Sequence, residues 1–483
     1  TNLKDMHELY CAGHLFQAAI AHHRATGKTN LLDIAIRFAD HITRVFGPGK
    51  REGVPGHPEV EMALVELYRE TNDQKYLDLA KFFIDERGKG LIGGSSYHID
   101  HKPFRELEEI VGHAVRSLYL NSGATDLYME IGDKALRNAL ERLWDNLVTK
   151  KMYVTGAAGA RHEGESFGDP YELPNETAYA ETCAAIANFM WNYRMLLTSG
   201  EGRFVDVMEL ALYNGVLPGI SIDGKEYFYV NPLADRGGHR RQRWFACACC
   251  PPNIARTITS IPGYIYSLSP EGIWVNLYAS NVSEFDVNGS RVVIEEKTNY
   301  PWEGLIEFKI NADSLFSIFL RKPEWSREFS VYTNGEEVKP VLERGYFVIN
   351  RKWQKGDTIT LDLHMKPELL ESHPNVKDNV GRVAIRRGPI VYSLEAEDNS
   401  GANVWDIEIP KDVKLDEEYQ NILGGIVTVK GKGYINEPEA WKKLYLPLEK
   451  ANHLKKELEF TAIPYYAWAN RTPGPMEIWI KTK

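Results

Sequence analysis

The stretch "GHPEVEMALVELYRETNDQKYLDLAKFF" at residues 56–83 holds two helical segments joined by a short polar turn. Its apolar residues Val60, Ala63, Leu64 and Leu67 recur at helical spacing, which predicts a helix before the turn. The polar pair at 71–72 is of the kind that ends one helix and caps the next. The stretch therefore predicts a helical hairpin.

Similar stretches recur through the first 215 residues or so: "TGKTNLLDIAIRF" from Thr26, "SGATDLYMEIGDKAL" from Ser122 and "SGEGRFVDVMELAL" from Ser199. Each begins with a small polar pair that we expect to separate two helices, and each then places an acidic residue among apolar ones. A repeat of this kind favours stacked helical hairpins.

A second repeat places Gly-His pairs at Gly13-His14, Gly56-His57 and Gly112-His113, each near the front of the helix that precedes a repeat unit. If the hairpins close into a ring, these helices are the inner ones, and the three histidines point at a common centre. The alternative is that each histidine only caps a helix or is satisfied in the core.

After about residue 264 the hydrophobic period changes from 3.6 to 2, as in "LIEFKI", "LFSIFL" and "TITLDLHM". Asn334-Gly335 and Gly356-Asp357 are expected turns between strands. We therefore expect an antiparallel β-sandwich followed by a second β unit. The predicted domains are a helical domain at 1–263, a β-sandwich at 264–388 and a β-rich C-terminal domain at 389–483.

The helical part resembles an incomplete ring. Six hairpins need twelve helices, whereas the sequence before residue 264 shows roughly eight or nine. We interpret it as a helical toroid in which either the ring is smaller or an N-terminal part is absent, and we favour the second explanation.

Composition excludes several classes of function. The 483 residues are 43% hydrophobic and 26% charged, with a net charge of −10, which argues against a nucleic-acid partner. No apolar run reaches the length of about 18 residues that a membrane span needs. Five cysteines, odd in number and unevenly spaced, do not make a disulfide framework. A reducing compartment follows, and we expect a cytoplasmic protein.

Three of the cysteines lie in "CACCPPN" at 247–253, and a fourth, Cys183, follows Glu181 at the start of a predicted helix. Glu181, Cys183, Cys249 and Cys250 make a set of three thiolates and one carboxylate, which suits Zn²⁺. Buried structural thiols and a metal-free reactive cysteine are the alternatives. Cys11 and Cys247 are expected to be small core residues.

The segment "VTGAAGARHEGESFGDPYELPNETAYAETC" leads into that helix and is rich in glycine and acidic residues. It is expected to be a loop, with Glu163, Glu165 and Asp169 as candidate acids. The alternative is that these carboxylates are only solvated.

Four stretches together resemble glycoside hydrolase family 127, the bacterial β-L-arabinofuranosidases: "GESFGDPYELPNETAYAETCAA", "YNGVLPGISIDGKEYFYVNPL", "WFACACCPPNIAR" and "AIPYYAWANRTPGPM". The resemblance spans residues 1–483. The family's N-terminal region has no counterpart in this stretch, in agreement with the missing helices expected above. It implies an (α/α)6 barrel followed by β-sandwich domains, and hydrolysis of terminal non-reducing β-L-arabinofuranosides with retention.

The resemblance also implies roles for individual residues. Cys249 matches the nucleophile and a zinc ligand, and Cys250, Cys183 and Glu181 match the other zinc ligands. Glu165 matches the general acid/base. His14, His57 and His113 match histidines of the sugar pocket. Tyr229 is a further substrate-binding candidate, with Tyr227 and Phe228 as neighbouring alternatives.

The expected partner is a small arabinose-containing oligosaccharide or glycopeptide, and we expect a homodimer. Two other functions are considered: the same mechanism acting on another furanoside or pyranoside, and a non-catalytic carbohydrate-binding protein with a structural zinc. The presence of both Glu165 and Cys249 argues against the latter.

Overall fold

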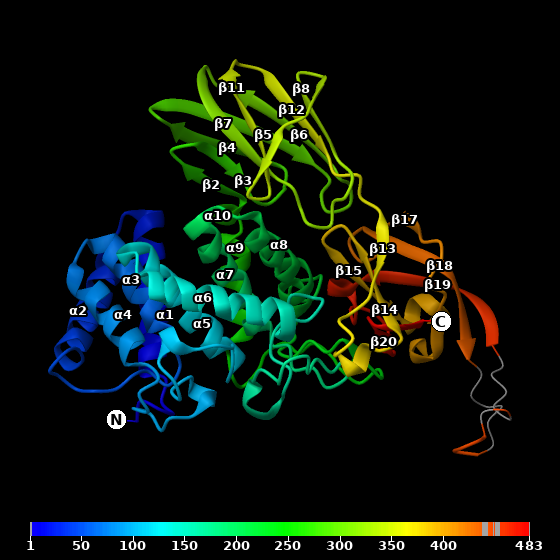
Figure 1. Ribbon diagram of the computed structural model, residues 1–483, viewed down its shortest axis with the longest axis horizontal. Helices are drawn as coiled ribbons and strands as arrows, with labels where there is room; N and C mark the ends of the chain where they lie inside the picture. The colour runs from blue at the N-terminus through cyan, green and yellow to red at the C-terminus, as the bar shows by residue number, and fades with distance from the viewer. Residues whose placement is uncertain (1, 437–442, 448, 450–454, 483) are drawn as a thin grey trace. The chain divides into compact units, whose positions relative to one another are not determined.

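The computed structural model describes residues 2–436, 443–447, 449 and 455–482 (Figure 1). The chain divides into two compact units. The first comprises Thr1–Tyr153, Ala157–Leu173 and Tyr179–Ser199. The second comprises Val154–Gly156, Pro174–Ala178 and Gly200–Lys483. Residues 200–263, which the sequence analysis placed in the helical domain, thus belong to the second compact unit.

The described part of the first unit contains seven α-helices, which form successive hairpins. They are α1 (Glu8–Thr26), α2 (Asn30–Val45), α3 (Val60–Thr71), α4 (Gln74–Glu86), α5 (Ala114–Ile131), α6 (Lys134–Asn146) and α7 (Thr182–Ser199).

Local sequence explains where these helices begin and end. Gly27 and Asn72 adopt the left-handed conformation that closes α1 and α3. Asp73 caps the start of α4 by accepting a hydrogen bond from the backbone N–H of Lys75. The turns expected after Thr26, Thr71 and Ser199 are therefore confirmed.

The turn expected at Ser122-Gly123 is wrong, because α5 runs through both residues and ends at Ile131. Gly132 and Asp133 supply the real C-cap and N-cap. Gly123 has a different purpose. A Cβ added there would lie 2.9 Å from Cβ of Glu61 and 3.0 Å from the backbone nitrogen of Met62, so glycine lets α5 lie directly against α3.

The odd-numbered helices α1, α3, α5 and α7 pack on one another in that order, and α2, α4 and α6 each pack on the preceding odd-numbered one. Residues 114–127 of α5 are all buried, whereas α2 and α6 each expose a polar face. The first group therefore forms the inner layer of the unit, as the sequence analysis expected.

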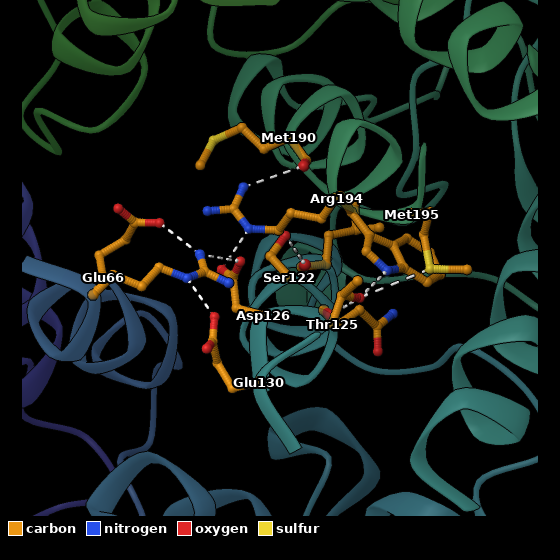
Figure 2. Close-up of polar contacts among 12 residues, drawn as sticks. Glu66, Ser122, Thr125, Asp126, Glu130, Met190, Arg194 and Met195 are labelled. Carbon is orange, nitrogen blue, oxygen red and sulfur yellow. Dashed lines mark hydrogen bonds and ion pairs between the residues drawn. The ribbon is translucent and has the colours of Figure 1, made fainter. Parts of the chain in front are cut away.

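Ion pairs tie the C-terminal halves of the inner helices together (Figure 2). Asp126 of α5 is buried and accepts hydrogen bonds from Arg69 of α3, at 3.0 Å, and from Arg194 of α7, at 2.6 Å. Arg69 also binds Glu130, and Arg24 of α1 binds Glu70 of α3. Residues near the C-terminal end of each inner helix pair with residues near the C-terminal end of its neighbour. The four inner helices therefore run parallel.

Replacing Asp126 by asparagine should destabilise the first unit. The amide keeps the shape of the side chain but removes the buried negative charge that Arg69 and Arg194 share, at a cost of about 3 kcal/mol. Chemical denaturation should show this loss. Glu130→Gln removes a carboxylate that is 23% exposed and should cost no more than about 1 kcal/mol. Equal effects of the two substitutions would contradict the assignment.

The second unit begins with three helices, α8 (Gly202–Ala211), α9 (Cys250–Ser260) and α10 (Pro262–Ile265). A β-sandwich follows, in which a five-stranded sheet of order β10-β11-β7-β3-β2 faces a six-stranded sheet of order β4-β5-β6-β12-β8-β9 across one hydrophobic core. Their bounds are β2 (Tyr266–Ser269), β3 (Gly272–Val275), β4 (Asn281–Val287), β5 (Ser290–Thr298), β6 (Leu305–Asn311), β7 (Ser314–Arg321), β8 (Ser330–Thr333), β9 (Glu336–Val338), β10 (Val341–Glu343), β11 (Tyr346–Trp353) and β12 (Asp357–Asp362).

The remaining strands form a ten-stranded sheet, which closes on itself because β14 pairs with β15 as well as with β21. The expected boundary at residue 388 lies in the hairpin between β14 and β15. The strands are β1 (Ala234–Asp235), β13 (Pro367–Leu370), β14 (Arg382–Arg387), β15 (Ile390–Glu395), β16 (Ile407–Ile409), β17 (Asp416–Gln420), β18 (Ile426–Asn436), β19 (Lys455–Pro464), β20 (Met476–Glu477) and β21 (Ile480–Thr482).

The expected architecture, helices followed by β-sandwich domains, is confirmed, with two differences of detail. The β3–β7 and β16–β21 pairs are parallel, whereas we expected antiparallel pairing. On β7 both faces are buried, because Phe319 on the outer face stacks on Trp274 with ring centroids 3.7 Å apart. The expected Asn334-Gly335 turn joins β8 to β9.

Glu296 of β5 is a buried carboxyl group in the sandwich. Burial raises its pKa from 4.5 to about 8, although Tyr266, Ala279 and Asn281 donate hydrogen bonds to it. The folded protein therefore binds more protons than the unfolded chain between these two pH values. Stability from this group is present below pH 4.5 and is lost as the pH rises toward about 8.

Glu296→Gln should remove this pH dependence, because an amide stays neutral. Near pH 5 the variant and the parent should unfold at similar temperatures, whereas at pH 8 the variant should be the more stable by on the order of 4 kcal/mol at most. Thermal unfolding at both pH values measures the difference. Glu295→Gln, which alters a neighbouring carboxylate paired with Lys297, is the control and should show no such trend.

Candidate active site

The three histidines of the Gly-His pairs gather near the N-terminal ends of the inner helices. The ring centroids of His57 and His113 lie 5.6 Å apart, and the ring of Tyr10 lies 4.4 Å from both His14 and His57. His14 is also held by the buried Glu59, with Nδ1 3.2 Å from Oε1. The convergence expected from the repeat is therefore present within this unit.

His57 is neutral near pH 7. Burial lowers its pKa well below 6.5, and the nearby His113 and Arg116 lower it further. Its Nδ1 lies 2.8 Å from the carbonyl oxygen of Pro58, which can only accept, so Nδ1 carries the proton. Nε2 is then a hydrogen-bond acceptor.

Glu165 lies on a short turn at residues 163–165 whose backbone is unusual. Gly164 and Glu165 both have positive φ, 66° and 49°, a conformation that costs a non-glycine residue on the order of 1 kcal/mol. The turn is anchored on both sides, by mutual backbone hydrogen bonds between Arg161 and Ser166 and by one from Phe167 N–H to the carbonyl oxygen of Gly112. Glu165 itself remains about one-third exposed.

His113 binds the Glu165 carboxylate and fixes its position. The Nδ1 atom of His113 accepts a hydrogen bond from the backbone N–H of Arg116, so the proton lies on Nε2, which donates to Oε2 of Glu165 at 2.9 Å. Glu181 lies close to both residues. One ligand atom from each of His113, Glu165 and Glu181 lies within 4.8 Å of the others.

Glu181 and Cys183 owe their positions to the start of α7. The carbonyl oxygen of Glu181 accepts the first helical hydrogen bond, from Ala185, and both side chains are buried. The N-terminus of a helix favours negative charge, so a buried carboxylate and a thiolate are both stabilised there. Glu163 and Asp169, the other candidate acids, are not part of this group.

Cys249 and Cys250 occupy the equivalent place on α9 in the second unit. Cys249 is the N-cap and Cys250 the first helical residue, and Pro251 and Pro252 lie in the first turn, where the helix needs no N–H donor. The two sulfur atoms are 3.7 Å apart. Both thiols are free of disulfides, and Cys250 is buried.

Tyr229 contacts this cysteine pair. Its hydroxyl oxygen lies 3.2 Å from Sγ of Cys249 and 3.9 Å from Sγ of Cys247. Of the two neighbouring aromatic residues, Phe228 is buried and stacks on His239 and Trp468 instead. Cys247 and Cys11, which we expected in the core, are exposed, so that expectation is wrong.

The donor set of Glu181, Cys183, Cys249 and Cys250 is one that could hold a metal ion. The sulfur separation provides a test of its fit. Thiolates bound to a tetrahedral zinc at about 2.3 Å are about 3.8 Å apart, close to the 3.7 Å between Cys249 and Cys250. The separation within the cysteine pair therefore fits a zinc ion.

Several residues around the histidines were missed by sequence reasoning. Tyr10 precedes His14 by one helical turn, and this spacing could have revealed it. Tyr97 and Arg116 carried no such signal, because Tyr97 comes from a short 3-10 helix, Ser96–His98, outside the repeat, and Arg116 looks like an ordinary helix surface residue.

Comparison with known proteins identifies the family. The sequence model of the β-L-arabinofuranosidase GH127 catalytic domain matches residues 1–263, the middle-domain model matches 272–365 and the C-terminal-domain model matches 367–481. The chain belongs to glycoside hydrolase family 127. It is therefore a glycoside hydrolase.

Individual relatives agree with this family. A non-reducing end β-L-arabinofuranosidase of Bifidobacterium longum is 36% identical, over 99% of this chain and 79% of its own length. The crystal structure of a GH127 β-L-arabinofuranosidase from Geobacillus stearothermophilus T6 matches with a TM-score of 0.95 and 42% identity, covering 100% of this chain and 81% of that one. The structure of a second GH127 β-arabinofuranosidase matches with a TM-score of 0.94 and 42% identity, covering 100% of this chain and 78% of that one.

Family 127 membership agrees with the helical and β architecture. None of the helices in the described residues combines the length and hydropathy that a membrane span requires.

Proposed function

We propose that this family 127 enzyme is a retaining exo-glycosidase that hydrolyses terminal non-reducing β-L-arabinofuranosides, with Cys249 as nucleophile and Glu165 as general acid/base. The observation that carries the proposal is the cysteine pair at the start of α9, with Tyr229 in contact with the sulfur of Cys249. The names of the family and of its relatives support the choice of substrate.

Glu181, Cys183, Cys249 and Cys250 would hold a zinc ion in this proposal. When bound, zinc keeps its cysteine ligands deprotonated at neutral pH. The start of α9 acts in the same direction, because a helix N-terminus stabilises negative charge. The Tyr229 hydroxyl can donate a hydrogen bond to the thiolate and orient it.

The reaction follows the two steps of a retaining glycosidase. The Cys249 sulfur attacks the anomeric carbon, the bond to the leaving oxygen breaks, and Glu165 gives its proton to that oxygen. A water molecule then attacks the same carbon, Glu165 takes the proton from it, and the carbon–sulfur bond breaks. Two inversions give net retention, and a thiolate replaces the carboxylate nucleophile found in most such enzymes.

The histidines have separate tasks in this scheme. Nε2 of the neutral His57 can accept a hydrogen bond from a sugar hydroxyl group. His14 is oriented by Glu59, and its ring and that of His57 both lie against Tyr10. His113 holds the Glu165 carboxylate. This cluster of imidazole and phenol groups offers hydrogen-bond partners to the several hydroxyl groups of a furanose.

The stereochemistry and the two roles can be tested together. Proton NMR of β-L-arabinofuranoside hydrolysis should show the β-anomer as the first product. Cys249→Ser should lower kcat by about a thousandfold or more, because a serine hydroxyl is a much poorer nucleophile. With a 2,4-dinitrophenyl β-L-arabinofuranoside, whose leaving group needs no proton, Glu165→Gln should accumulate a pentosyl adduct on the Cys249 peptide, detected by mass spectrometry. Initial formation of the α-anomer, or full activity of Cys249→Ser, would refute the mechanism.

Metal content provides an independent test. We expect about one zinc per chain by elemental analysis. Cys183→Ser and Cys250→Ser should each lower both zinc content and activity, and a chelator should inactivate the parent enzyme reversibly. Cys247→Ser is the matched control, since it changes a neighbouring thiol outside the ligand set and should retain the metal. A zinc-free but fully active enzyme would exclude the proposed site.

The finer expectations stay predictions. The substrate is expected to be a small arabinose-containing oligosaccharide or glycopeptide, and the protein a cytoplasmic homodimer without a nucleic-acid partner. A panel of nitrophenyl glycosides would distinguish β-L-arabinofuranosides from other furanosides and pyranosides.

A further inference from the structure

Tyr97 is a partly exposed aromatic residue from the segment between α4 and α5, and the mechanism above does not use it. Its ring lies directly against the turn that carries Glu165. A Cβ added to Gly164 would lie 3.0 Å from Cε2 and 3.1 Å from Cδ2 of Tyr97, so the backbone of Gly164 already rests on the ring. Any larger residue at 164 would push the turn and the ring apart.

Tyr97 is itself held from two directions. Its carbonyl oxygen accepts a hydrogen bond from the backbone N–H of His113 at 3.2 Å. Gly112 makes this approach possible: its φ is +79°, and a Cβ there would lie 2.3 Å from the carbonyl oxygen of Ser96. The backbone of Tyr97 is thereby joined to His113, the residue that binds the Glu165 carboxylate.

Arg116 holds the ring of Tyr97. Its Cζ lies 4.6 Å from the ring centroid, which is the geometry of a cation–π contact. The guanidinium is buried, and its Nε and Nη1 have no hydrogen-bond partner among the described residues. A buried cation with two unpaired N–H groups is costly unless a nearby group stabilises it. The ring of Tyr97 is such a group.

We propose that Tyr97, held by Arg116, is a positioning residue that sets the location of Glu165 by supporting the Gly164–Glu165 turn. The turn needs support, because Glu165 is in a left-handed conformation and would relax if the contact were lost. His113 binds Oε2 of the carboxylate, and the ring of Tyr97 contacts the backbone of the turn that carries it. This inference rests on the proposed role of Glu165 as general acid/base.

Leaving groups of different acidity separate this role from a merely structural one. A methyl aglycone needs a proton in order to leave, whereas 2,4-dinitrophenolate leaves without one. A displaced acid therefore lowers kcat/KM for methyl β-L-arabinofuranoside and leaves that for the dinitrophenyl glycoside nearly unchanged. General damage to the pocket would lower both equally.

Tyr97→Leu removes the ring and Tyr97→Phe keeps it. We expect Tyr97→Leu to lower kcat/KM for the methyl glycoside about 100-fold and for the dinitrophenyl glycoside about 3-fold or less, since small misplacements of a catalytic group cost about this much. With the dinitrophenyl substrate, azide should raise the kcat of Tyr97→Leu, because azide attacks without a general base. Tyr97→Phe should stay within about 3-fold of the parent on both substrates.

Gly164→Ala tests the same contact from the other side and covers the case in which Tyr97→Leu does not fold. The added methyl group should give the same dependence on the leaving group, and combining the two substitutions should cost less than the product of the single effects. Equal losses on both glycosides, or no loss on the methyl glycoside, would overturn the inference. A parent enzyme inactive on both glycosides would instead refute the proposed function.

Discussion

The carboxylate of Asp126 of α5 is bound by Arg69 of α3 and by Arg194 of α7. These ion pairs fix how far each of the three helices is shifted along its axis relative to the others. Because these helices are parallel, alignment at one end sets the alignment at the other. That other end is where His57, His113 and Glu181 lie, each at or next to the start of a helix. The chemistry of the first unit thus depends on ion pairs formed several helical turns away from it.

The parallel arrangement also sorts the charges. Arginines and their carboxylate partners lie toward the C-terminal ends of the inner helices, where the helix dipole favours cations. Glu181 and Cys183, two of the candidate ligands, lie at the N-terminal end of α7, where it favours anions. Cys249 and Cys250 on α9 follow the same rule in the second unit. The backbone at these helix starts therefore favours the anionic forms of the Glu181 carboxyl group and of the cysteine thiols.

Much of this organisation could be predicted from the sequence, because it rests on short-range signals. Turns at Gly27 and Gly200 follow helix-capping rules, and the Gly-His repeat correctly brought three histidines together. The turn expected at Ser122-Gly123 failed for a long-range reason: Gly123 allows the close approach of α3, and this approach has no local signature. The parallel β3–β7 pair likewise depends on which distant strand is available.

The candidate site shows the same division. Its ligand set was recognisable because residue types carry chemistry. The sequence predicts Tyr229 with Tyr227 and Phe228 as alternatives, and the contact of Tyr229 with Cys249 favours that choice. Tyr97 and Arg116 could not have been found, since their importance lies in what they touch. The ring of Tyr97 contacts Gly164, and the guanidinium of Arg116 contacts that ring. These residues come from segments that nothing in the sequence links.

Placing the reactive residues at helix starts and the ion pairs toward helix ends has a consequence for how such a chain can evolve. Each residue added to or removed from an inner helix shifts everything beyond it by about 1.5 Å and rotates it by about 100°. Either the candidate site residues or the ion-pair residues would then no longer face their partners on the neighbouring helices. The inner helices can accept substitutions but are effectively fixed in length, whereas the outer helices and their connecting loops are free to lengthen. Insertions and deletions among relatives should therefore accumulate on the outer layer.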